Sequence, residues 1–486
     1  MSEIKDTQQH PKVEIAVKNF GPIAEANIDL RPLTVFVGPS NTGKTYFATL
    51  MYALYGITGG FTPFPLQDLA NSSLVSVLHQ LQRKYLLSVS VEEKKAIREL
   101  LNATTEQLKK LITNRSPIKF SDIPQVLCDY LQSNLKNPKV IGDELNRCYD
   151  LKSVSDLIRF TSSTHYEMQV SLKVSSEDQE WWNFNMITTK SDLVVDGAIN
   201  ADLVLAPEDD PLWNSTYSDE FTDDTPDSRK RYYLPASRSG IIQSHRIMAS
   251  SLMERAVRSN GSDIPTLSSV IVDFMKHLPI YEESKESDST ILAIAETLEN
   301  NVLAGKIIAK PLLSGYPEFF YQPHGTKEEI HLNQTSSMVS ELAPLVLFLR
   351  SGIKPGDTLI IEEPEAHLHP GAQADMAVIL ARLVRAGVRV IITTHSDWLL
   401  QEIGNLIRAG ELGKAGKEVS DLPTSLQKEQ VGIWHFQKDG KVEEIPYNRI
   451  DGVEPMEYLD VAEDLYNRSA RLQNRLEEMK GDNERE

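Results

Sequence analysis

The chain has 486 residues, of which 41% are hydrophobic and 24% are charged, so it is long enough for roughly two or three globular domains. Its 50 Lys and Arg against 69 Asp and Glu give a net charge of −19. This balance argues against non-specific coating of DNA or of an anionic membrane, although a local basic groove stays open. Cys128 and Cys148, the only cysteines, fit neither a disulfide framework nor a zinc site. With no apolar stretch long enough to cross a bilayer, the sequence predicts a cytoplasmic protein without a membrane partner.

The first predicted elements are two strands. Apolar residues alternate at Val13, Ile15 and Val17 and again at Ile28 and Leu30, as expected of strands with one buried face. The sequence Asn-Phe-Gly-Pro between them is typical of a turn.

A phosphate-binding loop follows the third predicted strand, residues 33–37. The motif is G-x-x-x-x-G-K-[ST], in which glycines let successive N–H groups turn toward a β-phosphate. Lys44 would add positive charge at the β- and γ-phosphate oxygens, and Thr45 would offer a hydroxyl to Mg²⁺. A helix that begins near Gly43 points its positive end at the same anion. The motif therefore predicts binding of a nucleoside triphosphate with Mg²⁺ by Gly38, Pro39, Ser40, Asn41, Thr42, Gly43, Lys44 and Thr45.

The middle of the chain changes character. Segments such as residues 92–112 have apolar residues three and four apart, which indicates helices, and helices are again expected from about 241 to 307. Residues 167–174 alternate like a strand, whereas residues 209–227 are acidic and turn-rich and predict an exposed loop.

This order predicts a head domain split by a large insertion. The head is expected to have an N-terminal lobe over 1–60 and a C-terminal lobe over 311–415. Between them, 61–310 is expected to form a mostly helical insertion or lid, with a β segment near 165–206 and a return to the core near 231–240. The remaining residues, 416–486, are expected to form two strands near 431–436 and 441–445 and a charged helix from about 455 to 480.

Two acids follow a strand that reads as buried on both faces, residues 358–361. Glu362 and Glu363 stand where a Walker B element belongs. The functional interpretation is that Glu362 holds the Mg²⁺ shell and that Glu363 polarises the attacking water near the γ-phosphate. The alternative is a solvated strand end.

Histidines mark the next loops. His395 follows a second buried strand, residues 388–393, so its imidazole is expected at the same γ-phosphate as a sensor or positioning group. His367 and His369 have no matching Cys or His cluster nearby, which favours loop packing or a subunit contact over metal binding.

The segments GPSNTGKT, SSMVSE, LIIEEPEAHLHP and VIITTHSDWLL, in that order, resemble the ABC-type ATPases of the RecF, SMC and OLD group. The resemblance spans about residues 12–60 and 315–410. It implies an α/β fold: an ABC-type P-loop head, with a mixed sheet and flanking helices, that binds and hydrolyses ATP with Mg²⁺ and has a large, mostly helical insertion.

By this resemblance, residues 336–341 stand where the family's signature motif lies. That implies a head-to-head homodimer, or a higher even oligomer, with two composite sites. Ser336, Ser337, Ser340 and Glu341 are then the candidate contacts to ATP bound by the other subunit. The segment departs from the LSGGQ consensus because it has no glycine between Ser336 and Ser340. The alternative for Ser336 is a simple helix N-cap.

Residues 232–240 (YYLPASRSG) resemble the stretch at which related ATPases leave the core sheet. The resemblance implies that Gln243 is the Q-loop glutamine that contacts Mg²⁺ and that Arg238 contacts phosphate; surface or capping roles are the alternatives. Phe20, in the turn before the core strand, is a candidate for packing near adenine, with a buried aromatic as the alternative.

The insertion lacks long heptad repeats and a C-x-x-C hook, and no D-x-D cluster follows His395. The chain thus resembles an OLD-type ATPase without the Toprim nuclease, similar to standalone ATPases of antiviral defence systems such as Septu and PARIS. We therefore expect a dimeric ATP-driven switch that controls a partner nuclease or toxin. The alternative is a RecF-like DNA-maintenance ATPase that clamps DNA. A nuclease in its own right is disfavoured because the sequence shows no recognisable set of nuclease catalytic residues.

Overall fold

The fold is described from a computed structural model. It describes residues 11–58, 60–61, 103, 107, 118–123, 125–159, 167–176, 179–206, 230–244, 268–278, 288–310, 317–416, 424–450, 452–453 and 464–475.

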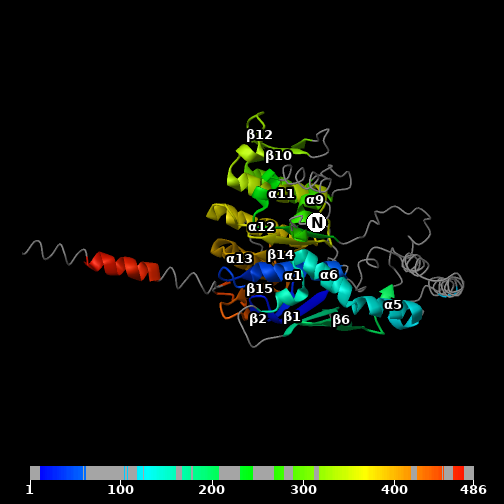
Figure 1. The fold of residues 1–486 in the computed structure, drawn as a ribbon. Coiled ribbons are helices and arrows are strands. Elements are labelled where there is room, and N and C mark those ends of the chain that lie inside the picture. Colours follow the sequence, from blue (N-terminus) through cyan, green and yellow to red (C-terminus); the bar gives the residue numbers. More distant parts are fainter. Residues whose placement is uncertain are drawn as a thin grey trace, which may run out of the picture.

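A six-stranded sheet forms the centre of the protein (Figure 1). Its order is β16-β15-β3-β14-β13-β9; the five strands from β15 to β9 run parallel, and β16 pairs antiparallel with β15. The sequence predictions of buried parallel strands and of two late strands are confirmed. The strands are β3 (Leu33–Val37), β9 (Arg231–Leu234), β13 (Thr358–Glu362), β14 (Arg389–Thr393), β15 (Val431–Phe436) and β16 (Val442–Glu444).

A second sheet is antiparallel and has the order β2-β1-β5-β6-β7. β1 pairs with β2 on one side and with β5 on the other, where Ile15 lies opposite Leu172. Part of the predicted insertion therefore completes the sheet that the N-terminal strands begin, and it belongs structurally with the head. These strands are β1 (Lys12–Phe20), β2 (Ile23–Leu30), β5 (Glu167–Ser175), β6 (Glu180–Thr189) and β7 (Leu193–Ile199).

Helix α1 (Lys44–Thr58) lies between the two sheets. Phe47 and Leu50 of α1 share one core cluster with Ile15 of the antiparallel sheet and with Ile360 and Ile391 of the central sheet. A helix packed on both sides must be apolar nearly all round, which explains the run Tyr-Phe-Ala-Thr-Leu-Met at its start.

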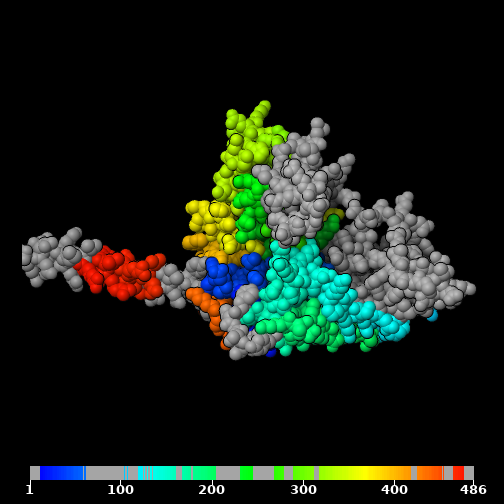
Figure 2. Space-filling model, in the orientation of Figure 1, coloured from blue at the N-terminus to red at the C-terminus, as the bar shows by residue number. Residues whose placement is uncertain are grey.

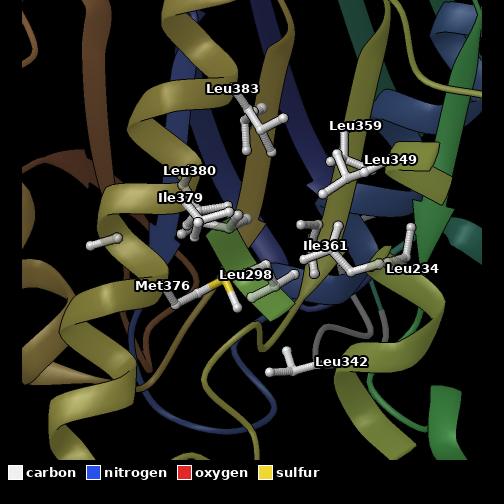
Figure 3. Packing of buried hydrophobic residues seen from close by; sticks show 14 of the residues in the cluster. Leu234, Leu298, Leu342, Leu349, Leu359, Ile361, Met376, Ile379, Leu380 and Leu383 are labelled. Atoms are coloured by element: carbon white, nitrogen blue, oxygen red, sulfur yellow. The ribbon is translucent and has the colours of Figure 1, made fainter. Parts of the chain in front are cut away.

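The other face of the central sheet is covered by α10 (Ser289–Leu298), α11 (Ser337–Ser351), α12 (Pro370–Arg385) and α13 (Asp397–Lys414). Because successive strand residues point to opposite faces, Leu359 and Ile361 face these helices while Ile360 faces α1. Leu359 and Ile361 form one cluster with Leu349 of α11 and Leu380 of α12 (Figure 3). Each such fully buried side chain contributes about 2 kcal/mol.

Smaller elements complete the described part of the chain. A three-stranded sheet has the order β10-β11-β12, and β4 pairs with β8. The remaining elements are β4 (Ile118–Lys119), β8 (Val204–Ala206), β10 (Gly305–Lys310), β11 (Glu318–Pro323), β12 (Ile330–His331), α5 (Gln125–Leu135), α6 (Pro138–Tyr149), α9 (Ser269–His277), the π-helical turn Glu299–Leu303, the 3-10 turns Phe120–Asp122, Val154–Leu157, Leu332–Gln334 and Lys428–Gln430, and a helical segment at 238–244.

The acidic segment 209–227 lies outside the described residues, and so does most of the predicted helix over 92–112. The charged C-terminal helix is confirmed over residues 464–475, which are almost all exposed and are red in Figure 2. Within the described residues, no helix combines the length and apolar character that a bilayer crossing requires.

Candidate nucleotide-binding site

Three adjacent parallel strands end at one edge of the central sheet. Phe36 of β3 lies opposite Thr393 of β14, which in turn lies opposite Glu362 of β13. The register continues beyond the strands, because the amide of Glu363 donates to the carbonyl of Thr393 at 2.9 Å. The predicted phosphate loop, the acid pair and His395 therefore emerge at the same edge.

The loop between β3 and α1 requires its glycines. Gly38 and Gly43 have φ values of 131° and 106°, in the region that side chains disfavour. A Cβ atom at Gly38 would lie 2.3 Å from the carbonyl oxygen of Phe436, and one at Gly43 would lie 2.8 Å from Ile23 Cγ1. The Thr42 hydroxyl closes the turn by donating to the carbonyl of Pro39 at 2.9 Å.

Lys44 lies across this loop. Its Nζ donates to the carbonyls of Gly38 and Pro39, both at 2.7 Å, and the residue is only 6% exposed. The first hydrogen bond of α1 runs from the Phe47 amide to the Gly43 carbonyl at 2.8 Å, so the preceding amides point out of the helix end. An ammonium and a helix N-terminus directed at one loop, beside exposed Ser40, Asn41 and Thr45, fit a polyphosphate.

Glu362 is held at the end of β13. It is 8% exposed; one carboxylate oxygen accepts from the Tyr233 hydroxyl and the other from the Ala236 amide at 3.3 Å. Burial raises the pKa of Glu362, and these two donors oppose the shift. Burial also raises the pKa of Tyr233 well above its ordinary value, so the phenol stays a donor.

Tyr233 also connects Glu362 to α1. Its oxygen lies 3.4 Å from the hydroxyl oxygen of Thr49, which is one helical turn beyond Thr45 and on the same face of α1. An exposed hydroxyl and a carboxylate on facing elements are the oxygen donors that Mg²⁺ prefers. Thr45 and Glu362 therefore fit the magnesium site that the sequence predicts.

Glu363 has an unusual backbone conformation. Its φ is 43°, the left-handed region, which costs a non-glycine residue about 1 kcal/mol or more. Its amide bonds to Thr393, and its carbonyl accepts from Nη2 of Arg238 at 3.2 Å. Strain is thus maintained at the residue predicted to orient water, and it fixes where the partly exposed side chain leaves the backbone.

His395 is the second residue of the loop after β14, and its side chain is partly exposed. Its amide donates to Oε1 of Glu365 at 2.7 Å, and burial raises the pKa of Glu365. His367 and His369 are both exposed, and His369 caps α12 by accepting the Gly371 amide at 3.3 Å. Within the described residues, no group of three or more His, Cys, Asp or Glu side chains has an arrangement that could hold a metal ion.

The signature segment divides into two pairs. Ser336 and Ser337 are exposed, and Ser336 caps α11 by accepting the Val339 amide at 3.4 Å. Ser340 and Glu341 are buried on the inner side of the helix, at 1% and 2% exposure. Only the first pair is positioned to meet a ligand from outside, and the cap role that the sequence left open is present as well.

Arg238 is placed differently from the phosphate contact that the resemblance implied. It is 1% exposed, and its guanidinium donates to protein oxygens, including the Glu362 carbonyl at 2.7 Å and the Glu341 carbonyl at 2.9 Å. Gln243 lies on the helical segment 238–244 with an exposed side chain.

Phe20 is fully buried, with edge contacts to Tyr46 and Tyr149 at ring-centre distances of 6.0 and 6.1 Å. Its environment is that of a core aromatic, which was the alternative to adenine packing. The sequence interpretation missed Tyr233, and the available signal was a polar aromatic residue next to the end of the predicted strand before Pro235.

Comparison with known proteins gives one family match and several solved structures with a similar chain. Residues 13–400 match the family model described as AAA ATPase domain. No curated protein matches the chain. Similar solved structures are the SMC head bound to the C-winged helix domain of ScpA (12% identity, 90% of this chain and 98% of that chain, TM-score 0.42), the SMC head domain from Thermotoga maritima (10%, 90% and 100%, 0.37) and the recombination mediator RecF with ATP (11%, 90% and 100%, 0.32). The family match spans β3, β13 and β14 with all their loops, and the chain belongs to the AAA ATPase domain family.

Proposed function

We propose that this chain hydrolyses ATP at the edge where β3, β13 and β14 end and works as a dimeric, nucleotide-driven switch. The observation that carries the proposal is the meeting of the loop, the acids and the histidine loop on three adjacent strands. In the sequence the phosphate loop is more than 300 residues from the acids and the histidine loop, and in the sheet all three follow adjacent strands.

Different residues bind the phosphates and the magnesium ion. Lys44 exchanges its two carbonyl partners for phosphate oxygens, and the N-terminus of α1 provides amides and a positive dipole end. Thr45 and Glu362 would hold Mg²⁺, which when bound supplies charge neutralisation between the β- and γ-phosphates.

Glu363 and His395 act on the reaction itself. Glu363, fixed by its left-handed backbone, orients the attacking water and accepts its proton while the water oxygen bonds to the γ-phosphorus. The bond to the β-phosphate breaks, leaving ADP and phosphate. His395 contacts the γ-phosphate from the neighbouring strand end and responds to its departure.

The second subunit completes each site. Ser336 and Ser337 form the exposed start of the 15-residue helix α11, whose positive end is suited to a phosphate. We propose that this end meets the γ-phosphate bound by a twin molecule. ATP then favours the closed dimer, and ADP, which lacks that phosphate, does not.

The switch is proposed to control a partner protein. By its resemblance to OLD-like ATPases without a Toprim domain, that partner is a nuclease or toxin of an antiviral defence system. The net charge of −19 and the exposed helix over 464–475 support a protein partner over the alternative, a RecF-like clamp on DNA.

Two measurements test this. The purified chain should release phosphate from ATP only with a divalent cation, and the absence of release would contradict the assigned chemistry. Purification from its genomic context, with and without ATP, should recover a neighbouring nuclease or toxin. Recovery of the chain on duplex DNA alone would favour the clamp instead.

A further inference from the structure

The buried guanidinium of Arg238 joins two parts of the site that the proposed function uses for different nucleotides. On one side it donates to the carbonyls of Glu362 at 2.7 Å and Glu363 at 3.2 Å, next to the chain's own ATP. On the other side its Nε donates to the Glu341 carbonyl at 2.9 Å and lies 3.2 Å from Glu341 Oε2. Glu341 belongs to α11, whose first residues face the ATP of the twin.

This ion pair is isolated from solvent. The side chains of Arg238 and Glu341 are 1% and 3% exposed, and the Ser239 hydroxyl donates to the remaining oxygen of Glu341. Removing two charges from water costs nearly as much as their attraction returns, so such a pair is weak evidence for stability. Its planar, directional hydrogen bonds do fix how α11 sits against the end of β13.

The Glu363 backbone is sensitive to that position. Its φ of 43° is a strained conformation, and the bond from Arg238 to its carbonyl is one of the contacts that hold it. A small displacement of α11 would move Glu341, then Arg238, then the strained peptide. Packed interfaces of this kind switch between discrete arrangements instead of deforming continuously.

We propose that Arg238 is a positioning residue that couples the two composite sites of the dimer. When Ser336 and Ser337 engage the twin's ATP, the Glu341–Arg238 pair transmits the contact to residues 362–363 and sets Glu363 for hydrolysis of the chain's own ATP. The inference rests on the proposed dimer and adds the chain of contacts through which ATP at one site changes the backbone at the other.

A mixed dimer isolates this path. One chain is isotope-labelled and has Lys44→Ala, so that only its unlabelled, otherwise unchanged twin binds ATP. Hydrogen exchange is then read in the labelled chain by mass spectrometry, with ATP and EDTA so that no turnover occurs. Peptides over 336–343 report contact with the twin's ATP, and peptides over 360–366 report what reaches the Glu363 backbone.

We expect ATP to slow hydrogen exchange in both segments of the labelled chain, and the exchange rate over 360–366 should fall about tenfold. Adding Glu341→Gln to that chain should leave the protection over 336–343 and abolish it over 360–366. The matched control is Glu299→Gln, because Glu299 is 2% exposed and pairs with Arg350 at the opposite end of the same helix α11. It removes a comparable buried pair and should leave both protections intact.

The outcomes separate the two claims. The coupling is overturned, and the dimer is not, if protection over 360–366 survives Glu341→Gln. The same holds if the labelled Lys44→Ala chain without Glu341→Gln shows protection over 336–343 but none over 360–366. No ATP-dependent protection over 336–343 overturns the dimer and the coupling together. In homodimers, Glu341→Gln should lower kcat about tenfold with unchanged ATP affinity, a split that simple destabilisation of the Glu299→Gln kind would not produce.

Discussion

The hydroxyl of Tyr233 donates a hydrogen bond to the carboxylate of Glu362, and both groups are almost fully buried, at 2% and 8% exposure. β9 thereby contributes a neutral donor to the acid at the end of β13. A buried carboxylate without donors would be protonated near neutral pH, so this bond helps to keep Glu362 ionised.

Tyr233→Phe should therefore destabilise the protein more at pH 7.5 than at pH 4. Burial already raises the pKa of Glu362, and loss of a donor to its charged form raises that pKa further. The stability lost through the substitution therefore grows as pH rises from the raised pKa of Glu362 in the unaltered protein through its still higher pKa in the variant. We expect about 2 kcal/mol at pH 7.5 and about 1 kcal/mol at pH 4, measured by urea unfolding in EDTA.

Tyr232→Phe is the matched control. It lies on the same strand, and its hydroxyl donates to the neutral Gly352 carbonyl at 2.8 Å. Its cost should be the same at both pH values. Equal pH behaviour of the two variants would contradict an ionised Glu362.

Lys44→Ala should weaken ATP binding about 100-fold, because about 3 kcal/mol of charge-assisted bonds to phosphate is lost. Titration with a fluorescent ATP analogue measures this. Lys18→Ala serves as control, since Lys18 is an exposed lysine that pairs with Glu25 at 3.6 Å. Wild-type ATP affinity in the Lys44 variant would mean that this loop does not bind the phosphates.

Glu363→Gln should slow phosphate release about 10²- to 10⁴-fold, the usual contribution of a positioned base. ATP should stay bound, so the dimer accumulates in analytical ultracentrifugation. Glu328→Gln, in the exposed turn between β11 and β12, should behave as wild type. Normal turnover by Glu363→Gln would mean that another group orients the water.

Ser336→Arg should leave ATP binding to the monomer intact and block turnover, because a bulky cation occupies the exposed start of α11. It should also cost about 1 kcal/mol for the lost helix cap. Ser191→Arg, in the exposed turn after β6, controls for a surface arginine. An unaffected rate in Ser336→Arg would argue against composite sites.

Much of the site could be predicted because its signals are local. The glycines before Lys44 encode their own backbone geometry, and residues 358–361 and 388–393 are near-continuous apolar runs because their strands are buried on both faces. Acids directly after such strands must lie at the sheet edge.

Other features depend on pairing between distant segments. Nothing local in residues 167–175 shows that they pair with residues 12–18, so the sequence alone predicts this strand as part of the insertion. Arg238, next to serines and a glycine, has the composition of a phosphate contact. Its burial arises only when α11 and β13 pack around it, and its partners Glu341 and Glu362 are over 100 residues away.

The most direct test of the account is cross-linking between two differently tagged chains that also have Glu363→Gln. One has Ser40→Cys in the phosphate loop and the other has Ser337→Cys at the start of α11; the native Cys128 and Cys148 are buried. With ATP and Mg²⁺, a short thiol cross-linker should join the two tags, and with ADP it should not. Failure to join them with ATP bound would contradict the composite site on which the account depends.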